Sequence, residues 1–314
     1  MKANQKYPRF VLTYDNTASF DGTGAQIHRI LAVYAICKRF NIPYLHSGIS
    51  ELIITPLDPF QTELELQEYL VRVNQYFELP SDVGVRDFRS VRKLHNLTKM
   101  NLLNIRARNM VKSGRKELIA VANPLQVINR IPDIYRLAAK NPSDLKSGSA
   151  KKKIVLHYRR GSNTLDVLPG ESKPRGLPNS WYLRTLRKYV AIYQNLGIDF
   201  TIEIFTDMPK SSFVYQPKDF QLDLWSYEPR FKEGKIEVFG EDIRNTLFSE
   251  FDSNLVVHHG GDPLQGLISM SVADILITSR SSYSYVGGLL NLGGVVVFPP
   301  EFAHGRLNSW VLEP

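Results

Sequence analysis

Two adjacent arginines, Arg159 and Arg160, follow the apolar segment Ile154–Leu156 and a histidine, His157. Neighbouring guanidinium groups repel each other unless an anion lies close to both. Arginine can bind a phosphate in a bidentate manner that lysine cannot match, so the pair predicts a phosphate-binding loop. In the alternative interpretation, one arginine pairs with a carboxylate, the other is solvated, and His157 is a packed core residue.

A second candidate loop, residues 21–26, carries Gly22 and Gly24 directly before a helical pattern. Glycines in this position let the backbone N–H groups of a helix N-terminus approach an anion. The loop is not a P-loop, because no Gly-Lys-Ser/Thr follows, and it is not a dinucleotide-binding G-x-G-x-x-G motif, because Ile27 occupies the third glycine position. The alternative is a tight turn in which Gly22 or Gly24 has a positive φ.

Two further loops carry polar side chains after apolar segments. Residues 279–284 read SRSSYS before a helical pattern, so their hydroxyl and backbone N–H groups could donate to phosphate oxygens. Capping of the helix by Ser281 or Ser282 is the alternative, and it is compatible with phosphate binding. Residues 258–263, HHGGDP, suggest a metal site, but adjacent histidines on a strand point to opposite faces. We therefore expect no metal there.

The elements between these loops predict an α/β fold. Strands are predicted over 9–15, 42–47, 153–158, 199–207, 253–259, 274–279 and 293–300, and helices over 25–40, 62–77, 96–113, 122–140, 181–197, 263–273 and 282–292. The polar stretch 140–153 is the predicted boundary between an N-terminal domain, 1–148, and a C-terminal domain, 149–314. Apolar strands alternating with helices predict mostly parallel sheets, whose ligands bind beyond the strand carboxyl ends. We expect two such domains with a cleft between them.

The composition limits the class of partner. The 314-residue chain has a net charge of +8, which favours anionic partners such as nucleic acids, anionic membranes or phosphorylated small molecules. No zinc-finger or recognition-helix signature is present, so a nucleic-acid partner is not expected. The lone cysteine, Cys37, excludes an internal disulfide and a cysteine-rich metal site. Because neither a signal-peptide pattern nor a long apolar run is found, we expect a cytoplasmic protein with at most peripheral membrane association.

Three segments together resemble the GDP-fucose-dependent fucosyltransferase superfamily, which includes α1,2-, α1,6- and protein O-fucosyltransferases. The segment GTGAQIHRILAVYAICKRFNIPY is similar to the G-x-G-N-Q segment of that family and the helix after it. LHYRRGS is similar to its H-x-R-R-x-D segment. ADILITSRSSYSYVGGLLNLGG is similar to its A-D-x-L-I-x-S-x-S-S-F-S element.

The resemblance implies a GT-B fold, in which two Rossmann-like domains with mostly parallel sheets face a central cleft. It implies an inverting glycosyltransferase that moves fucose from GDP-fucose to a glycan hydroxyl, with no metal and no further cofactor. Arg159 and Arg160 would hold the donor pyrophosphate, Arg159 as a catalytic group, and Asp21 would be the base. The residues implied in donor binding are Gly22, Gly24, Gln26, His157, Arg159, Arg160, Asp262, Ser279, Ser281, Ser282 and Tyr283.

The chain departs from the family pattern at three places. Ala25 replaces an asparagine, Ser162 and Asn163 follow the arginines where the family has an aspartate, and Gly266 stands where relatives have an acidic residue that reads the base. These departures bear on guanine and fucose more than on a nucleotide sugar in general. A transferase for another nucleotide deoxysugar, such as a rhamnosyl donor, therefore stays open. So do a non-catalytic nucleotide- or glycan-binding homologue and a basic nucleic-acid-associated protein. The sequence does not indicate an oligomeric state.

Overall fold

The chain is divided into two compact α/β units. The structure is a computed structural model that describes residues 9–17, 22–52, 62–84, 88, 90–108, 117–137, 151–160, 176–215, 236–238 and 240–314. Unit 1 comprises Met1–Leu52, Glu63–Lys140 and Ala303–Asn308, and unit 2 comprises Ile53–Thr62, Asn141–Phe302 and Ser309–Pro314. The predicted boundary between residues 148 and 149 lies outside the described residues.

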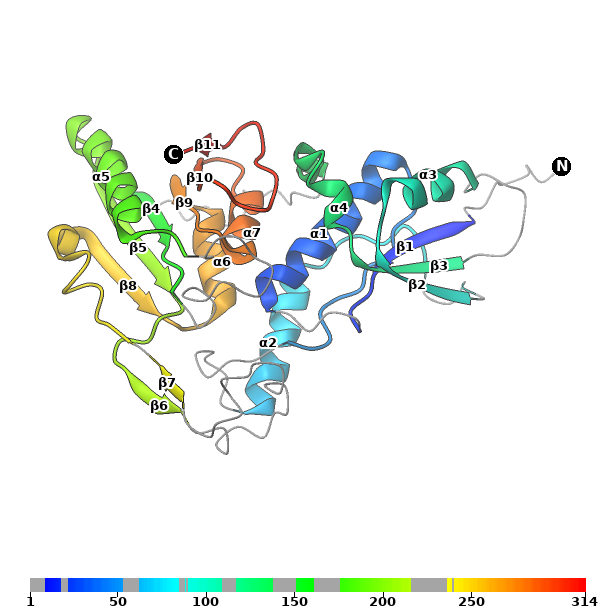
Figure 1. Cartoon of the computed structure of the whole chain (residues 1–314), viewed down its shortest axis with the longest axis horizontal. Helices are drawn as coiled ribbons and strands as arrows, with labels where there is room; N and C mark the ends of the chain where they lie inside the picture. The colour runs from blue at the N-terminus through cyan, green and yellow to red at the C-terminus, as the bar shows by residue number, and fades with distance from the viewer. Residues whose placement is uncertain are drawn as a thin grey trace. The chain divides into compact units, whose positions relative to one another are not determined.

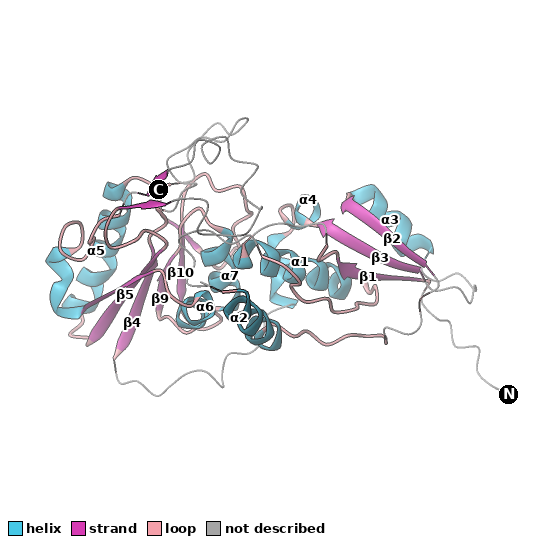
Figure 2. Ribbon diagram, turned by 90° about the horizontal axis from the view of Figure 1, so that it is seen from below, coloured by secondary structure: helices cyan, strands magenta, loops and turns pink. Residues whose placement is uncertain are grey.

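Unit 1 contains a three-stranded parallel sheet in the order β1-β3-β2. Its elements are β1 (Phe10–Tyr14), α1 (Thr23–Phe40), α2 (Glu63–Tyr76), β2 (Ser90–Asn96), α3 (Lys99–Arg108), β3 (Glu117–Asn123), α4 (Leu125–Ile128) and the 3₁₀ helix η2 (Pro132–Leu137) (Figures 1 and 2). Every side chain of β1 is buried, whereas β2 is mostly exposed. Both strands lie at an edge of the sheet, but the outer side of β1 is covered by the segment around Tyr44, which hydrogen-bonds to Leu12.

Three predictions for unit 1 are wrong. The segment 42–47 forms no strand, only an isolated parallel bridge between Leu12 and Tyr44. Strands β2 and β3 were not predicted, because the exposed residues of β2 lack an apolar pattern and β3 directly precedes a segment that reads as helical. The helix predicted over 122–140 is divided into α4 and η2. Pro132 supplies no backbone N–H at that point, so a continuous helix cannot form there.

Unit 2 contains a six-stranded sheet in the order β11-β10-β9-β4-β5-β8, and every pairing within it is parallel. The strands are β4 (Lys152–His157), β5 (Phe200–Thr206), β8 (Leu255–His259), β9 (Ile275–Ile277), β10 (Val295–Phe298) and β11 (Val311–Leu312). The helices are α5 (Asn179–Asn195), η7 (Ser249–Asn254), α6 (Pro263–Ser271) and α7 (Ser282–Leu290). A separate antiparallel pair is formed by β6 (Phe213–Tyr215) and β7 (Ile236–Val238). The strand order is that of a doubly wound Rossmann sheet.

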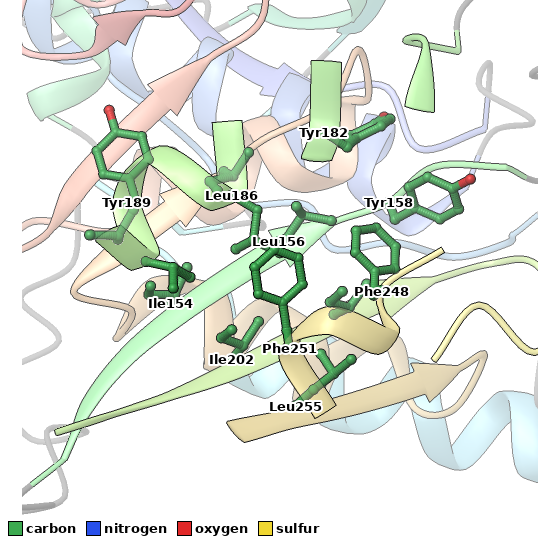
Figure 3. Close-up of a cluster of buried hydrophobic side chains, with 14 of the residues drawn as sticks. Ile154, Leu156, Tyr158, Tyr182, Leu186, Tyr189, Ile202, Phe248, Phe251 and Leu255 are labelled. Carbon is green, nitrogen blue, oxygen red and sulfur yellow. The ribbon is translucent and has the colours of Figure 1, made fainter. Parts of the chain in front are cut away.

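The core of unit 2 covers both faces of this sheet. On one face, aromatic and aliphatic side chains of α5 and η7 pack on β4 and β5, as Figure 3 shows for Leu156, Tyr182, Ile202 and Phe251. On the other face, Met270 of α6 packs with apolar side chains of β4 and β9. Burial on both faces explains why β4, β9 and β10 contain continuous apolar runs, whereas buried and half-buried side chains alternate along β5.

The predicted α/β fold with two parallel sheets is confirmed. None of the described helices has the length and apolar character to cross a membrane.

Candidate functional site

The strands of unit 2 reverse their direction of progression between β4 and β9. From β4 the chain proceeds through β5 to β8, and it then returns to the other side of β4 to form β9 and β10. The loops after β4 and β9 therefore diverge at a topological switch point, which is where parallel α/β sheets bind ligands. His157 ends β4, and residues 279–284 follow β9, so two of the loops selected from the sequence meet here.

Two side-chain hydrogen bonds join these loops. His157 Nδ1 and Ser279 Oγ are 2.8 Å apart, and Arg159 donates from Nη1 to Ser281 Oγ at 2.9 Å. In each of these bonds the two residues are more than a hundred positions apart in the sequence. The parallel pairing of β4 with β9 brings them together.

His157 is a neutral, buried residue of this junction. Its exposed fraction is 5%, and its ring lies edge-on to Tyr283, 5.3 Å away between centroids. Its pKa is lowered to about 4, mainly because burial disfavours the charged ring; Asp207 opposes this shift and Arg159 adds to it. His157 therefore carries no charge at neutral pH and offers a hydrogen bond rather than a cation. The packed interpretation of His157 and its place beside the candidate site are both compatible with this geometry.

The two neighbouring arginines have different environments. Arg160 donates from Nη1 to the carbonyl of Arg159 at 2.9 Å and from Nη2 to the carbonyl of Leu177 at 2.7 Å, and Nη2 also contacts Asn179 Oδ1. Its guanidinium lies over the ring of Tyr158, 4.4 Å from the centroid. Arg160 thus holds the loop after β4 against the start of α5.

Arg159 faces the start of α7 instead. It is half-buried, its Nη1 donates to Ser281, and its Nε is buried without a hydrogen-bond partner among the described residues. Neither arginine forms an ion pair with a carboxylate within the described chain. The alternative of one carboxylate-paired and one solvated arginine is therefore not what the structure has: Arg160 binds carbonyls and Arg159 a serine.

The start of α7 has a side-chain cap. Ser281 is the N-cap residue, and its hydroxyl accepts a hydrogen bond from the backbone N–H of Tyr283. Ser279 and Ser281 are buried, whereas Ser282 and Tyr283 are partly exposed. The capping interpretation of this loop is confirmed. The N-terminus of α7 adds the positive end of a helix dipole close to the Arg159 guanidinium, and both features favour an anion.

Tyr283 fills the space beside Gly266 of α6. A Cβ atom added at Gly266 would lie 2.2 Å from Tyr283 Oη, which donates a hydrogen bond to the carbonyl of Pro263 at 2.5 Å. Asp262 caps α6 by accepting from the N–H of Leu264 at 2.9 Å. Position 266 therefore cannot hold a side chain without displacing Tyr283.

The loop before α6 is not arranged around a metal. His259 Nδ1 donates to the carbonyl of Met208 at 3.0 Å, whereas the ring of His258 stacks on Phe205 with centroids 4.4 Å apart. Among the described residues, no three histidine, cysteine, aspartate or glutamate side chains form a group that could hold a metal ion. The backbone turns at Gly260 and Gly261, which have φ values of 71° and 93°.

The glycine loop belongs to unit 1, at the start of α1. Gly22 is the N-cap residue with a φ of −69°, and Gly24 lies within the first turn of the helix, so the positive-φ interpretation is wrong. Gln26 is fully buried; its Oε1 accepts from Tyr14 Oη at 3.3 Å and its Nε2 donates to the carbonyl of Glu51 at 2.6 Å. Asp21 lies outside the described residues.

Sequence reasoning missed Asp207, which follows β5 at the same edge of the sheet. Its Oδ1 accepts from the backbone N–H of Arg160 at 2.8 Å, so it fixes the chain between the two arginines and the start of the next loop. A signal was available, because Asp207 is the last residue of a predicted strand and parallel strands end at one edge. Asn179, which binds both Arg160 and Tyr158, had no such signal.

No family model and no curated protein matches the chain. Solved structures with similarity include POFUT1 in complex with GDP-fucose, at 11% identity and a TM-score of 0.48, over 92% of this chain and 95% of that chain. Two heptosyltransferases of E. coli are also similar. One is WaaC with ADP, at 9% identity and a TM-score of 0.40, over 96% and 92% of the two chains. The other is the ADP-heptose LPS heptosyltransferase II, at 9% and 0.36, over 95% and 86%. Likenesses at these values assign no function.

Proposed function

We propose that unit 2 binds the diphosphate of a nucleotide sugar at the loops after β4 and β9, and that the protein is a GT-B glycosyltransferase. GDP-fucose is the first donor to test, because the sequence segments that carry the family resemblance include both of these loops. A glycan hydroxyl is the proposed acceptor.

The observation that carries the proposal is the approach of Arg159 to Ser281 across the switch point. There, a half-buried guanidinium with a buried, unpartnered Nε lies next to the N-terminus of α7. A sugar transfer from a nucleotide donor develops negative charge on the departing diphosphate. A fixed cation and oriented N–H groups stabilise such charge without reorganisation, and each donor of this kind contributes about 10²–10³-fold to the rate.

The roles of the chain's own residues follow from their contacts. Arg159 binds the departing diphosphate, and Ser281 orients the arginine while capping α7. Arg160 and Asp207 position the loop that carries Arg159. Asp21 is the proposed base that accepts the proton of the acceptor hydroxyl. The acceptor oxygen then forms a bond to the anomeric carbon of the sugar, and the bond from that carbon to the diphosphate breaks.

The test measures nucleotide binding and transfer separately. Thermal unfolding is followed with GDP, UDP, dTDP, ADP and the corresponding sugars, because a ligand of the folded state raises the melting temperature by mass action. We expect a shift with at least one nucleoside diphosphate, and slow release of the sugar from the matching donor without acceptor. No shift with any nucleotide would reject the proposal.

Two variants distinguish the site from the fold. Arg159→Ala should lower the affinity for the nucleotide by about 10–100-fold, the value of one or two charge-assisted hydrogen bonds. Arg187→Ala on α5, which removes an exposed arginine paired with Glu250, is the matched control and should leave affinity unchanged. Asp21→Asn should abolish transfer while nucleotide binding persists; a variant with full transfer would exclude Asp21 as the base.

A further inference from the structure

The positive charge of the chain is concentrated in one stretch of unit 1. Residues 88–116 contain nine lysines and arginines and no aspartate or glutamate. The positive charge of this stretch therefore exceeds the net charge of the whole chain, which is +8. The stretch includes β2 and α3, and both views place α3 alongside the three strands of unit 1 (Figures 1 and 2). This surface is distinct from the candidate donor site in unit 2.

Helix α3 presents both cations and apolar side chains to solvent. Leu102 and Ile105 are buried, and they attach the helix to unit 1. Lys99, Met100, Leu103 and Arg106 are all exposed, and we call these four residues the α3 stripe. Lys99, Leu103 and Arg106 follow one another at helical spacing, and Met100 lies one turn before Leu103, so the four side chains share one side of the helix.

The apolar members of the α3 stripe are unusually open for side chains of their size. Met100 is 66% exposed and Leu103 is 47% exposed, and on the neighbouring strand Val91 is 61% exposed beside Arg92. Lys93 of the same strand is set apart, because its Nζ donates to Thr17 Oγ1 at 2.7 Å and lies 3.9 Å from Asp15. The two cations of the α3 stripe have no aspartate or glutamate near them in the sequence, because the stretch 88–116 contains neither.

We infer that the α3 stripe docks unit 1 onto an anionic lipid membrane. Aliphatic side chains flanked by lysine and arginine are the composition that binds the interface of a bilayer, where the apolar groups enter the headgroup region and the cations meet anionic lipids. A second copy of this chain is disfavoured, because two such surfaces would repel each other. A single-stranded nucleic acid is also disfavoured, because residues 89–116 contain no phenylalanine, tyrosine or tryptophan on which bases could stack.

Flotation of the full chain with lipid vesicles tests this inference, and it is independent of the proposed donor site because no nucleotide is present. Vesicles of phosphatidylcholine alone are compared with vesicles that contain about 30% phosphatidylglycerol, at a salt concentration of about 0.1 M. We expect retention on the anionic vesicles only, and release at high salt. Absence of retention, or equal retention on both kinds of vesicle, would overturn the inference.

Two variants of the α3 stripe separate its charges from its apolar side chains. Lys99→Gln/Arg106→Gln should weaken binding to anionic vesicles by about 25-fold, about fivefold for each charge. Met100→Ser/Leu103→Ser should weaken it by about tenfold through the loss of buried apolar area. All four side chains are exposed, so both variants should retain the wild-type melting temperature.

Helix α2 of the same unit supplies the matched control. Its Leu64 and Val71 are 68% and 54% exposed, but Glu63, Glu65 and Glu68 accompany them. Leu64→Ser/Val71→Ser should therefore leave vesicle binding unchanged, and an equal loss there would refute a specific role for α3. A single-stranded RNA oligonucleotide is assayed in parallel. Tight RNA binding that depends on the charge pair, together with vesicle binding unaffected by Met100→Ser/Leu103→Ser, would overturn the membrane assignment in favour of nucleic acid.

Discussion

The carboxyl edges of the two parallel sheets differ in what their side chains do. At the edge of unit 2, side chains from the loops after β4 and β9 bind each other, and Arg159 keeps a half-buried guanidinium there. At the edge of unit 1, the polar side chain at the start of α1, Gln26, is buried and hydrogen-bonded through both of its amide atoms. The first turn of α1 begins at Gly22 without a side-chain cap.

In unit 2, side chains are available to bind an anion at this edge. In unit 1, only backbone N–H groups at the start of α1 are available among the described residues. Unit 2 combines a cation, a capped helix and a neutral histidine at one switch point. Unit 1 uses its matching side chains for its own packing: even the hydroxyl of Thr23 accepts a hydrogen bond from Tyr69 at 2.9 Å. The carboxyl edge of the sheet thus carries the candidate site in unit 2 and a hydrogen-bonded structural junction in unit 1.

The largest expected effect is a loss of folding stability at low pH, caused by His157 at the edge of unit 2. Its folded pKa of about 4 lies below the ordinary value of 6.5, so the unfolded chain binds more protons between these pH values and stability falls as the pH is lowered. The loss should approach about 3 kcal/mol at pH 4. Thermal unfolding from pH 7 to pH 4 measures it.

His157→Gln should reduce this pH dependence and leave the part due to His28 of unit 1, whose pKa is also lowered by burial, whereas His95→Gln on the exposed strand β2 should leave it unchanged. If the stability of wild type and of His157→Gln fell equally with pH, the pKa of His157 would not differ between the folded and the unfolded chain, contrary to the prediction.

A glycine substitution at each edge gives the next largest contrast. Gly266→Ala should destabilise the protein by about 1–3 kcal/mol, because the new Cβ would meet Tyr283 Oη at 2.2 Å. Chemical denaturation measures the loss. Gly266→Ala combined with Tyr283→Phe should recover most of it, since the hydroxyl is the atom in conflict; failure of the pair to recover stability would place the strain elsewhere in α6.

The two arginines of unit 2 should separate binding from folding. Arg160→Ala removes hydrogen bonds to Leu177 and Asn179 and the contact with Tyr158, so we expect a loss of about 1–2 kcal/mol in unfolding free energy. Arg159→Ala should cost less stability and more nucleotide affinity. Denaturation and GDP titration of both variants measure the two effects, and equal effects in both assays would refute the separate roles.

The smallest effect is expected at the edge of unit 1. Gly22 has a φ of −69°, and no atom lies within 4 Å of the position that an alanine methyl group would take there. Gly22→Ala should therefore change stability by less than about 0.5 kcal/mol. A large loss in melting temperature would show that α1 is tightly covered at its start. A normal melting temperature with impaired transfer would assign a close backbone approach to this loop.

The sequence predicted unit 2 better than unit 1, for a physical reason. Strands β4 and β9 contain buried apolar runs, and β5 alternates buried with half-buried side chains, so each has a strand pattern of its own in the sequence. Strand β2 exposes most of its side chains, and its pairing with β3 is what makes it a strand. No pattern within residues 90–96 reports that pairing.

The sequence predicted the four loops of the candidate site, but not the contacts that their side chains make. The rule that parallel strands end together was enough to place His157 and Ser281 at one edge. It could not show that Arg160 binds carbonyls while Arg159 faces α7, because that depends on Asn179 and Leu177 in a different segment. Likewise, Gly266 looked like a lost acid, and only the position of Tyr283 explains why a glycine is needed.

The composition of unit 1 also has a consequence for synthesis on the ribosome. Residues 303–308 are made more than 160 residues after Lys140, yet they belong to unit 1. There, Asn308 Nδ2 donates to Asp133, Asn129 Nδ2 donates to the carbonyl of Ala303 at 3.2 Å, and the His304 ring lies 4.3 Å from that of His28. Unit 1 therefore cannot complete its packing until residues 303–308 have left the ribosome. A fragment ending at Lys140 would lack these contacts however long it was given to fold.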